Sequence, residues 1–521
     1  MRLPPAVRRA LASRAGHLTL AVLAGLALPL TLAPFDLWWL GPVIVAALLW
    51  LLWLAPDARA GFWTGWAYGV GKFGLGVSWI YVSIHEYGHA SPLLAGFLVA
   101  LFVAALALFH GIFGWLFVAG FGARRPAAGV PVPDARSALG FAGLWLLLDW
   151  VFTWVLTGFP WLLLGYGHLD SPLAGYAPLL GVHGVTAAVV ASGVLLALLV
   201  RPEQAAGPRS RRWLVPLLLT TLWGVGWLAR QVPHVQPLVP RDVALVQGNI
   251  PQDTKWNPAF VQRTLDTYVG LSTPHEDADI LLWPEAAVTM LLEDAGPFLD
   301  EMGRRTSARG GALVTGIVSW RRETGIRNLT VVVGRGEGVY TKRRLVPFGE
   351  YVPLEGLLRG LIGFFDLPMS HTEPGAPVQP LLRVGEAKIA MAICYEVVYP
   401  DLVREQARDA NLLATVSNDT WFGASIGPLQ HLQMARMRAL ELGRFMLRAT
   451  NNGVTAVIDA RGRVVAQLPQ FAPGVLRGQV WLMAGDTPYA RFGDVPVLAL
   501  LAGLLAAGWR GRRRSEQGAQ A

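Results

Sequence analysis

AKIAMAICYEVVYP, residues 387–400, starts with a largely apolar run that is followed by a cysteine, a tyrosine and a glutamate. Ala, Ile and Met bounded by more polar residues are typical of a buried strand. Cys394, at the end of this run, is the only cysteine among 521 residues. A single cysteine excludes an intramolecular disulfide framework and a cysteine-cluster metal site. On its own, such a thiol is more often a small buried hydrophobe than a nucleophile, so its surroundings must decide.

Similar β-rich runs recur between residues 240 and 486 and alternate with polar helical stretches. They read DVALVQGNI, ADILLWPE, GALVTGIVSW, NLTVVVGR, NLLATVSND and GVTAVIDARGRVVAQL. The segment GPLQHLQMARMRALELGRFMLRAT, residues 427–450, has apolar residues at helical spacing and predicts a helix. Strands that alternate with helices predict a layered α/β domain. About 245 residues are enough for such a domain to have its own core.

The chain as a whole has the composition of a membrane protein. Hydrophobic residues make up 53% of the chain, charged residues only 15%, and the mean hydropathy is +0.42. Soluble domains have roughly a quarter charged residues. Apolar windows near the length of about 20 residues that spans a bilayer predict eight membrane helices. They lie near 17–35, 37–54, 61–83, 91–121, 137–155, 171–200, 213–230 and 491–509.

Two of these windows contain a charged residue, Lys72 in 61–83 and Asp149 in 137–155. A charge at the bilayer centre costs about 2.5–3.5 kcal/mol on insertion scales. The two side chains therefore either face protein or water, or lie near the end of a span. The sequence leaves both alternatives open.

The distribution of arginines predicts the topology of the membrane part. If the N-terminus is cytoplasmic, sixteen arginines fall on the cytoplasmic side, whereas the short loops 34–36, 84–90 and 156–170 on the other side contain no Lys or Arg. This asymmetry follows the positive-inside rule. The arginines are 2, 8, 9, 14, 59, 124, 125, 136, 201, 209, 211, 212, 510, 512, 513 and 514.

The same asymmetry predicts three parts: a membrane domain at 1–239, an extracytoplasmic domain at 240–486, and a last span with a cytoplasmic tail at 487–521. The cytoplasmic segments have a net charge of +12, more than the +9 of the whole chain. The basic charge therefore indicates topology and not nucleic-acid binding. The basic start and first apolar stretch also resemble a signal peptide, but the many following spans favour an uncleaved first helix.

Three ionisable residues of the 240–486 domain lie where strand-like runs end. Glu285 follows ILLWP, Lys342 follows a strand-like run in YTKRRLVPFGEYVP, and Cys394 follows IAMAI. Strands hold their ends rigidly, and the loops beyond them open onto clefts. A carboxylate can take the proton of an attacking thiol, and an ammonium can stabilise the oxyanion that forms. This trio predicts acyl transfer through a thioester with ping-pong kinetics.

The three motifs, in this order, resemble the nitrilase superfamily, whose members use a Glu-Lys-Cys triad on an α-β-β-α sandwich. With seven spans before the domain and one after it, the chain resembles the membrane-embedded branch of that superfamily, the apolipoprotein N-acyltransferase family. VQGNIPQDTKW, WPEAA, KRRLVPFGEYVP, CYEVVYP and SNDTWFG are similar to motifs of the family. The resemblance implies that Glu285 is the general base, that Lys342 stabilises the tetrahedral intermediate and that Cys394 is acylated.

The resemblance also implies supporting roles for neighbours of the triad. Glu350 would orient Lys342 or the base, Tyr395 would offer its backbone N–H to the oxyanion, and Glu396 would buttress the site. Trp256 and Trp421 would line the substrate region, although either could be an ordinary packing aromatic. Asn418 and Asp419 of the motif SNDTWFG could simply shape a turn.

The implied reaction moves a fatty acyl chain from a membrane phospholipid to the α-amine of the N-terminal diacylglyceryl-cysteine of an apolipoprotein. The implied setting is the bacterial inner membrane, with both termini cytoplasmic, the catalytic domain periplasmic, and a monomeric enzyme without a cofactor. His85, Glu86 and His89 lie close together, but with no third ligand motif we expect no metal. The aromatic loop 156–170 could guide lipid tails or form an aromatic belt.

Two other functions are compatible with parts of this pattern. A membrane-tethered amidase that acts on a small soluble amide would share the triad, although one anchor would suffice for it. A transporter or sensor whose outer domain merely binds a ligand would not need the cysteine. Replacement of Cys394 by alanine distinguishes the second alternative from an acyltransferase.

Overall fold

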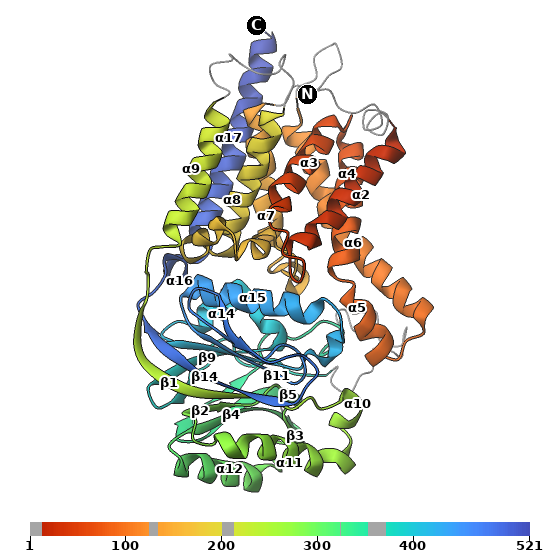
Figure 1. Ribbon diagram of the computed structural model, residues 1–521. Helices are drawn as coiled ribbons and strands as arrows, with labels where there is room; N and C mark the ends of the chain where they lie inside the picture. The colour runs from red at the N-terminus through yellow and green to blue at the C-terminus, as the bar shows by residue number, and fades with distance from the viewer. Residues whose placement is uncertain (1–12, 124–133, 201–212, 324, 353–370, 521) are drawn as a thin grey trace. The chain divides into compact units, whose positions relative to one another are not determined.

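The structure, a computed structural model, describes residues 13–123, 134–200, 213–323, 325–352 and 371–520, and divides into two compact units (Figure 1). The first unit comprises Met1–Tyr81, Ser91–Pro233 and Phe492–Ala521. The second comprises His234–Arg491 together with the short segment Val82–Ala90. The segment Val82–Ala90 therefore belongs to the α/β unit although it is far from it in the sequence.

The first unit is helical. Asp57 and Asp134 begin two of its helices, because each side chain accepts a hydrogen bond from a backbone N–H of the first turn, 2.8 Å from Ala60 and 2.8 Å from Ser137. Its helices are α2 (Arg14–Ala27), η1 (Leu28–Thr31), α3 (Leu40–Leu54), α4 (Ala58–Gly76), α5 (Trp79–Val82), α6 (Pro92–Phe121), α7 (Ala135–Val151), η3 (Val155–Thr157), η4 (Leu164–His168), η5 (Pro172–Tyr176), α8 (Ala177–Leu199), α9 (Leu214–Ala229) and α17 (Val495–Gln520).

Each of the eight predicted windows contains a helix, but eight membrane-spanning helices are not confirmed. Within the described residues, three helical segments are long and apolar enough to cross a membrane: Arg14–Thr31, Pro92–Phe121 and Pro172–Leu199. Leu40–Leu54, Leu214–Ala229 and Val495–Arg510 are shorter apolar helices. Helices α4 and α7 belong to neither group, since α4 is rich in glycine and both contain charged residues.

The glycines of α4 allow it to pack closely against α6. A Cβ atom on Gly65 would lie 2.0 Å from the carbonyl oxygen of His110, so only glycine fits there. Small residues one turn apart permit this kind of backbone contact between membrane helices. Lys72 of α4 and Asp149 of α7 are both buried, and Lys72 Nζ lies 3.5 Å from His110 Nε2. Both charged side chains thus face protein.

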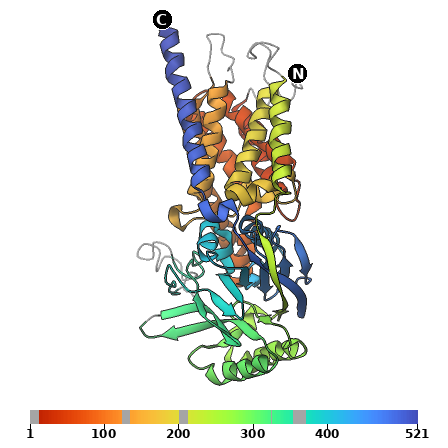
Figure 2. The same cartoon turned by 90° about the vertical axis from the view of Figure 1, so that its left-hand side faces the viewer.

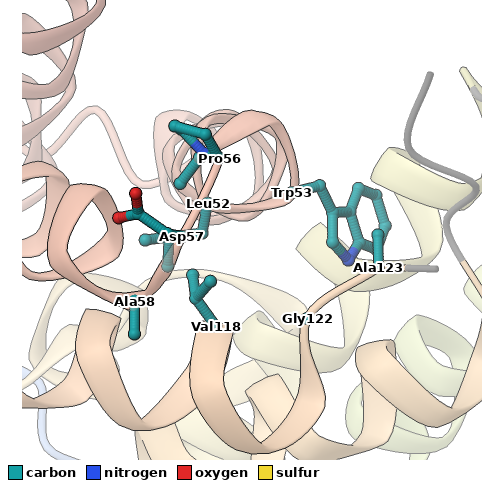
Figure 3. Close-up of a pocket in the computed structure, with 9 residues that line it drawn as sticks. Leu52, Trp53, Pro56, Asp57, Ala58, Val118, Gly122 and Ala123 are labelled. Carbon is teal, nitrogen blue, oxygen red and sulfur yellow. The ribbon is translucent and has the colours of Figure 1, made fainter. Parts of the chain in front are cut away.

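A cavity of about 260 Å³ lies where the turn between α3 and α4 meets the end of α6 (Figure 3). It is lined by Leu52, Trp53, Ala55, Pro56, Asp57, Ala58, Val118, Gly122 and Ala123. None of the candidate site residues is among them.

Two seven-stranded sheets form the centre of the second unit. The first has the order β14-β1-β2-β4-β5-β7, with β3 paired to β4, and the second has the order β13-β12-β11-β10-β9-β8-β6. The strands are β1 (Gln236–Gln247), β2 (Ile280–Leu282), β3 (Val288–Leu291), β4 (Ala312–Arg321), β5 (Gly325–Gly334), β6 (Gly336–Glu337), β7 (Val339–Thr341), β8 (Leu382–Val384), β9 (Ala387–Ile393), β10 (Leu412–Ser417), β11 (Met446–Thr450), β12 (Ala456–Ile458), β13 (Val464–Gln467) and β14 (Gly474–Ala484).

The sheets pack face to face and helices cover their outer faces. Apolar side chains of both sheets form one buried core, which includes Leu245, Val314 and Ile393. Helices α11 and α12 lie side by side on the first sheet (Figures 1 and 2), and α14 and α15 pack on the second. The expected α/β fold is confirmed, as four layers in the order α-β-β-α. The helices are α10 (Gln252–Lys255), η8 (Pro258–Phe260), α11 (Val261–Ser272), η9 (Thr273–His275), α12 (Gly296–Ala308), η11 (Cys394–Val398), α14 (Pro400–Gln406), η12 (Asp419–Phe422), α15 (Gly427–Leu442) and α16 (Pro488–Phe492), with η2 (Ser83–Tyr87) in the added segment.

The predicted helix over residues 427–450 is wrong beyond Leu442. Helix α15 ends there because Gly443 adopts a left-handed conformation with φ of 63°, a usual helix stop. The next residues, Met446–Thr450, form the buried strand β11 between β10 and β12. Helical spacing of apolar residues and the uniform burial of a central strand are hard to tell apart over such a short run.

Candidate functional site

Glu285 lies three residues beyond the end of β2, in a turn between β2 and β3. Its carboxylate accepts hydrogen bonds from Asn328 Nδ2 at 2.7 Å and from the backbone N–H of Asn418 at 2.8 Å. The next residue, Ala286, has a positive φ of 47°, which is uncommon for a residue with a side chain. The carboxylate is thus held by donors from β5 and from the residue that follows β10.

Lys342 follows β7 directly and is 1% exposed. Its Nζ donates to Glu350 Oε1 at 2.7 Å and to Glu285 Oε1 at 3.4 Å. The other oxygen of Glu350 accepts the backbone N–H of Val346 at 2.8 Å, so this carboxylate ties the lysine to its own loop. Burial lowers the pKa of Lys342, but Glu350 and Glu285 raise it more, and the net pKa is above its ordinary value. The lysine is therefore a fixed positive charge.

Cys394 directly follows β9 and begins η11 in a strained backbone conformation with φ of 54°. Nε2 of His431 on α15 lies 3.1 Å from the Cys394 carbonyl oxygen, and His431 Nδ1 lies 3.1 Å from Asp419 Oδ1. Arg448 donates in turn to Asp419 Oδ2 at 2.6 Å. A fully buried set of polar side chains thus supports the sharp turn at the cysteine.

Glu285, Lys342 and Cys394 are brought together, since both charges act on the thiol. Burial raises the pKa of Cys394, the Glu285 carboxylate raises it further, and Lys342 opposes both effects. The net pKa lies above the ordinary value for cysteine. Sulfur is therefore protonated at neutral pH and needs a base as it attacks, a task that the adjacent carboxylate can perform.

Glu396 joins the cysteine segment to the lysine segment. Its carboxylate accepts hydrogen bonds from Tyr340 Oη at 3.0 Å, from the backbone N–H groups of Arg343 at 2.6 Å and Arg344 at 3.1 Å, and from that of Ile393 at 2.7 Å. Burial raises the pKa of Glu396, and the backbone donors lower it in part. Because it accepts hydrogen bonds from the loop after β7 and from the last residue of β9, Glu396 fixes these two segments relative to each other.

The remaining sequence-predicted residues are three aromatic side chains. Tyr395 is buried, and its ring packs edge-on against Tyr399 at 5.3 Å. Trp256 follows α10 and is 41% exposed. Trp421 of η12 packs its ring against Tyr87 at 5.9 Å, and its carbonyl accepts a hydrogen bond from Ser83 Oγ at 2.7 Å. Trp421 is thus where the segment Val82–Ala90 contacts the rest of its unit.

Four residues of the site were missed or undervalued from the sequence. Asn328 and Asn418 orient Glu285, His431 supports Cys394, and Lys255 donates from Nζ to the backbone carbonyl of Glu285 at 3.0 Å. Asn328 and His431 lie inside a strand and a helix, where no motif marks them. The signal for Lys255 was its place directly before Trp256 in VQGNIPQDTKW.

Among the described residues, no group of three or more His, Cys, Asp or Glu side chains is placed to hold a metal ion. His85 Nδ1 lies 2.8 Å from the carbonyl oxygen of Ala90 and so closes its own loop.

Family models match both parts of the chain. The model described as apolipoprotein N-acyltransferase N-terminal domain matches residues 24–195, and the carbon-nitrogen hydrolase model matches residues 242–484. Among similar proteins, the apolipoprotein N-acyltransferase of Pseudomonas paraeruginosa is 48% identical over 508 residues, with 96% of this chain and 97% of that protein covered. That of Azotobacter vinelandii is 47% identical over 511 residues, with 96% of each chain covered.

Solved structures similar to the chain include Saccharomyces cerevisiae Nit3, a member of branch 10 of the nitrilase superfamily. The two share 17% identity with a TM-score of 0.36, over 51% of this chain and 97% of that one. A CN-hydrolase superfamily protein of Xanthomonas campestris shares 19% identity with a TM-score of 0.36, over 51% of this chain and 97% of its own.

Proposed function

Because this chain belongs to the apolipoprotein N-acyltransferase family, an enzyme family of lipoprotein maturation, we propose that it transfers a fatty acyl chain from a membrane phospholipid to the α-amine of an N-terminal diacylglyceryl-cysteine. The observation that carries the mechanism is the convergence of Glu285 and Lys342 on Cys394. It supports a thioester route with two half-reactions.

In the first half-reaction, Cys394 Sγ attacks the ester carbonyl carbon of the phospholipid while its proton moves to Glu285. The oxyanion of the tetrahedral intermediate is stabilised by the Lys342 ammonium, with the backbone N–H of Tyr395 as a second donor. The C–O bond then breaks, Glu285 returns the proton to the leaving oxygen, and a lysophospholipid departs. The acyl chain is left as a thioester on sulfur.

In the second half-reaction, the uncharged lipoprotein amine attacks the thioester carbon. Glu285 takes a proton from the attacking nitrogen and passes it to the departing sulfur, which restores the thiol. Glu350 keeps Lys342 charged and in place through both steps, which its 2.7 Å ion pair supports. Trp256, exposed beside the site, would contact the substrate, and so would Trp421.

The same proposal includes the location of the protein. We infer eight spans in the inner membrane, with membrane domain 1–239, periplasmic catalytic domain 240–486, and last span and tail 487–521. The sixteen arginines on the predicted cytoplasmic side support cytoplasmic termini. We infer a monomer, because one chain contains the whole triad.

Labelling of the only cysteine tests this mechanism. The full-length protein in membranes, given phospholipid with a labelled acyl chain, should acquire label that hydroxylamine removes, because hydroxylamine cleaves thioesters. Cys394→Ala should acquire none, and Glu285→Gln should slow labelling by at least about 10²-fold, since it removes the base. Adding a diacylated lipopeptide should discharge the label onto its amine. An unlabelled wild type that hydrolyses a soluble amide would instead indicate an amidase.

A further inference from the structure

A second buried lysine lies against the catalytic residues. Lys255 is the last residue of α10, is 1% exposed, and donates from Nζ to the backbone carbonyl of Glu285 at 3.0 Å. Within the described residues it forms no ion pair with a carboxylate, unlike Lys342, which is paired with Glu350. Burial of a lysine without an ionic partner is costly, so it persists only where its surroundings use or require the charge.

The position of Lys255 links it to the base. The carbonyl that it contacts belongs to the residue before Ala286, whose φ is positive, so the hydrogen bond pins the turn that presents the Glu285 carboxylate. Helix α10 is attached at a second point, because Asn418 Nδ2 donates to Gln252 Oε1 at 2.8 Å. Asn418 in turn donates its backbone N–H to Glu285 Oε2. Both ends of α10 thus contact the elements that hold the base.

The charges around the thiol explain why a second cation is useful. Glu285 and Asp419 disfavour a thiolate at Cys394, and Lys342 favours it. Lys342 shares its charge with Glu350, and Asp419 is neutralised by Arg448. Lys255 interacts electrostatically with both Glu285 and Cys394. As the proton leaves sulfur for Glu285, negative charge moves between two groups that both interact electrostatically with this ammonium.

We propose that Lys255 is a positioning residue of the acylation step, which holds the turn at Glu285 through its carbonyl and stabilises the Cys394 thiolate as its proton passes to Glu285. Lys255 neither gives nor takes a proton in the reaction. This role rests on the proposed thioester mechanism, and it adds a requirement for positive charge that the Glu-Lys-Cys triad alone does not contain.

The proposal predicts how acylation depends on pH. Burial lowers the pKa of Lys255 to about 8, against the opposing effects of Glu285 and Cys394. The ammonium is therefore present below pH 8 and is lost as the pH rises through that value. The pKa of Lys342 is raised, so Lys342 stays charged in this range. Acylation by the wild type should accordingly fall above a pH of about 8.

Three variants of the full-length enzyme in detergent test the role. Lys255→Met removes the charge at similar length, Lys255→Arg keeps a charge that does not titrate, and Lys388→Met removes an exposed lysine of β9 as the control. Two rates are followed from about pH 6 to 10: acylation by labelled phospholipid, and alkylation by iodoacetamide. Because Cys394 is the only cysteine, alkylation reports on this thiol alone.

We expect Lys255→Met to slow acylation by about 10²-fold at unchanged KM for phospholipid and to shift the alkylation profile to higher pH. Lys255→Arg should retain acylation without the fall above pH 8. This variant still tests the proposal if Lys255→Met does not fold. Lys388→Met should behave as the wild type. An unchanged alkylation profile in Lys255→Met, or an unchanged alkaline fall in Lys255→Arg, would overturn the proposal. If the wild type forms no thioester, the mechanism itself fails, and alkylation still tests Lys255.

Discussion

At the scale of single residues, the site is a set of charges that hold one another in place. Glu350 illustrates this, because its two oxygens bind Lys342 at 2.7 Å and the backbone of Val346 at 2.8 Å. One carboxylate thus both fixes the ammonium in space and keeps it protonated. A substitution that removes the charge of Glu350 and keeps its size therefore tests whether the charge, and not only the packing of the side chain, is required.

We predict that Glu350→Gln slows acylation of Cys394 by about 10²-fold, because the ammonium is less well held and less strongly charged. Glu350 raises the pKa of Lys342 against the effect of burial, so the amide variant lowers that pKa. In a Lys255→Arg background, which should lack the fall assigned to Lys255, Glu350→Gln should therefore introduce an alkaline fall in acylation that reports on Lys342. Single-turnover labelling across pH measures both effects, with the exposed Glu337→Gln as control. A Glu350→Gln enzyme with the wild-type rate, and with no alkaline fall in the Lys255→Arg background, would contradict the role.

At the scale of elements, the base is positioned by how closely β4 approaches the turn after β2. A Cβ atom on Gly316 of β4 would lie 2.5 Å from the backbone nitrogen of Ala286 and 2.7 Å from Glu285 Cα. Real Cβ atoms do not come this close to backbone, so any side chain at 316 must displace the turn that carries the carboxylate. This approach is the physical reason for a glycine inside a central strand.

Gly316→Ala should therefore reduce acylation by about 10²-fold, since displacing a reacting group by about 1 Å has an effect of this size. A loss of activity would be informative, because replacing glycine by alanine normally stabilises a folded protein by reducing the conformational entropy of its unfolded chain. Gly478→Ala in β14 is the matched control, since its Cβ would meet the side chains of Val457 at 3.5 Å and Val243 at 3.9 Å, which are ordinary van der Waals contacts. Loss in both variants would point to general destabilisation, and loss in neither would show that the turn tolerates displacement.

The elements that could be predicted from sequence are those whose pattern is local. The apolar runs before Glu285 and Cys394 predicted β2 and β9, and with Lys342 they led to the proposed triad, because each candidate residue follows its own strand. Strand β11 was missed, since its signal depends on burial between neighbouring strands. Lys255 and His431 act through backbone carbonyls of residues 30 and 37 positions away, and spacing in the sequence does not encode such contacts.

At the scale of the whole molecule, the chain consists of a helical unit and an α/β unit, and the α/β unit includes the segment Val82–Ala90 as well as His234–Arg491. The segment Val82–Ala90 joins the α/β unit through Ser83 and Tyr87, which contact Trp421. These contacts lie within the α/β unit, and they join the segment Val82–Ala90 to η12, which follows β10. The arginine distribution predicts on which side of the membrane the candidate site lies.

We predict that residue 378 faces the periplasm and residue 56 the cytoplasm. In the Cys394→Ala background, Val378→Cys lies at a position that is 89% exposed, and Pro56→Cys lies in the exposed turn between α3 and α4 and leaves Arg59 intact. A membrane-impermeant maleimide should label Val378→Cys in intact spheroplasts and Pro56→Cys only after lysis, because the basic turn stays inside. Both should react equally in detergent. Labelling of Pro56→Cys in intact spheroplasts would place this turn outside the cell. The predicted topology would then be inverted, and the thioester chemistry would take place in the cytoplasm.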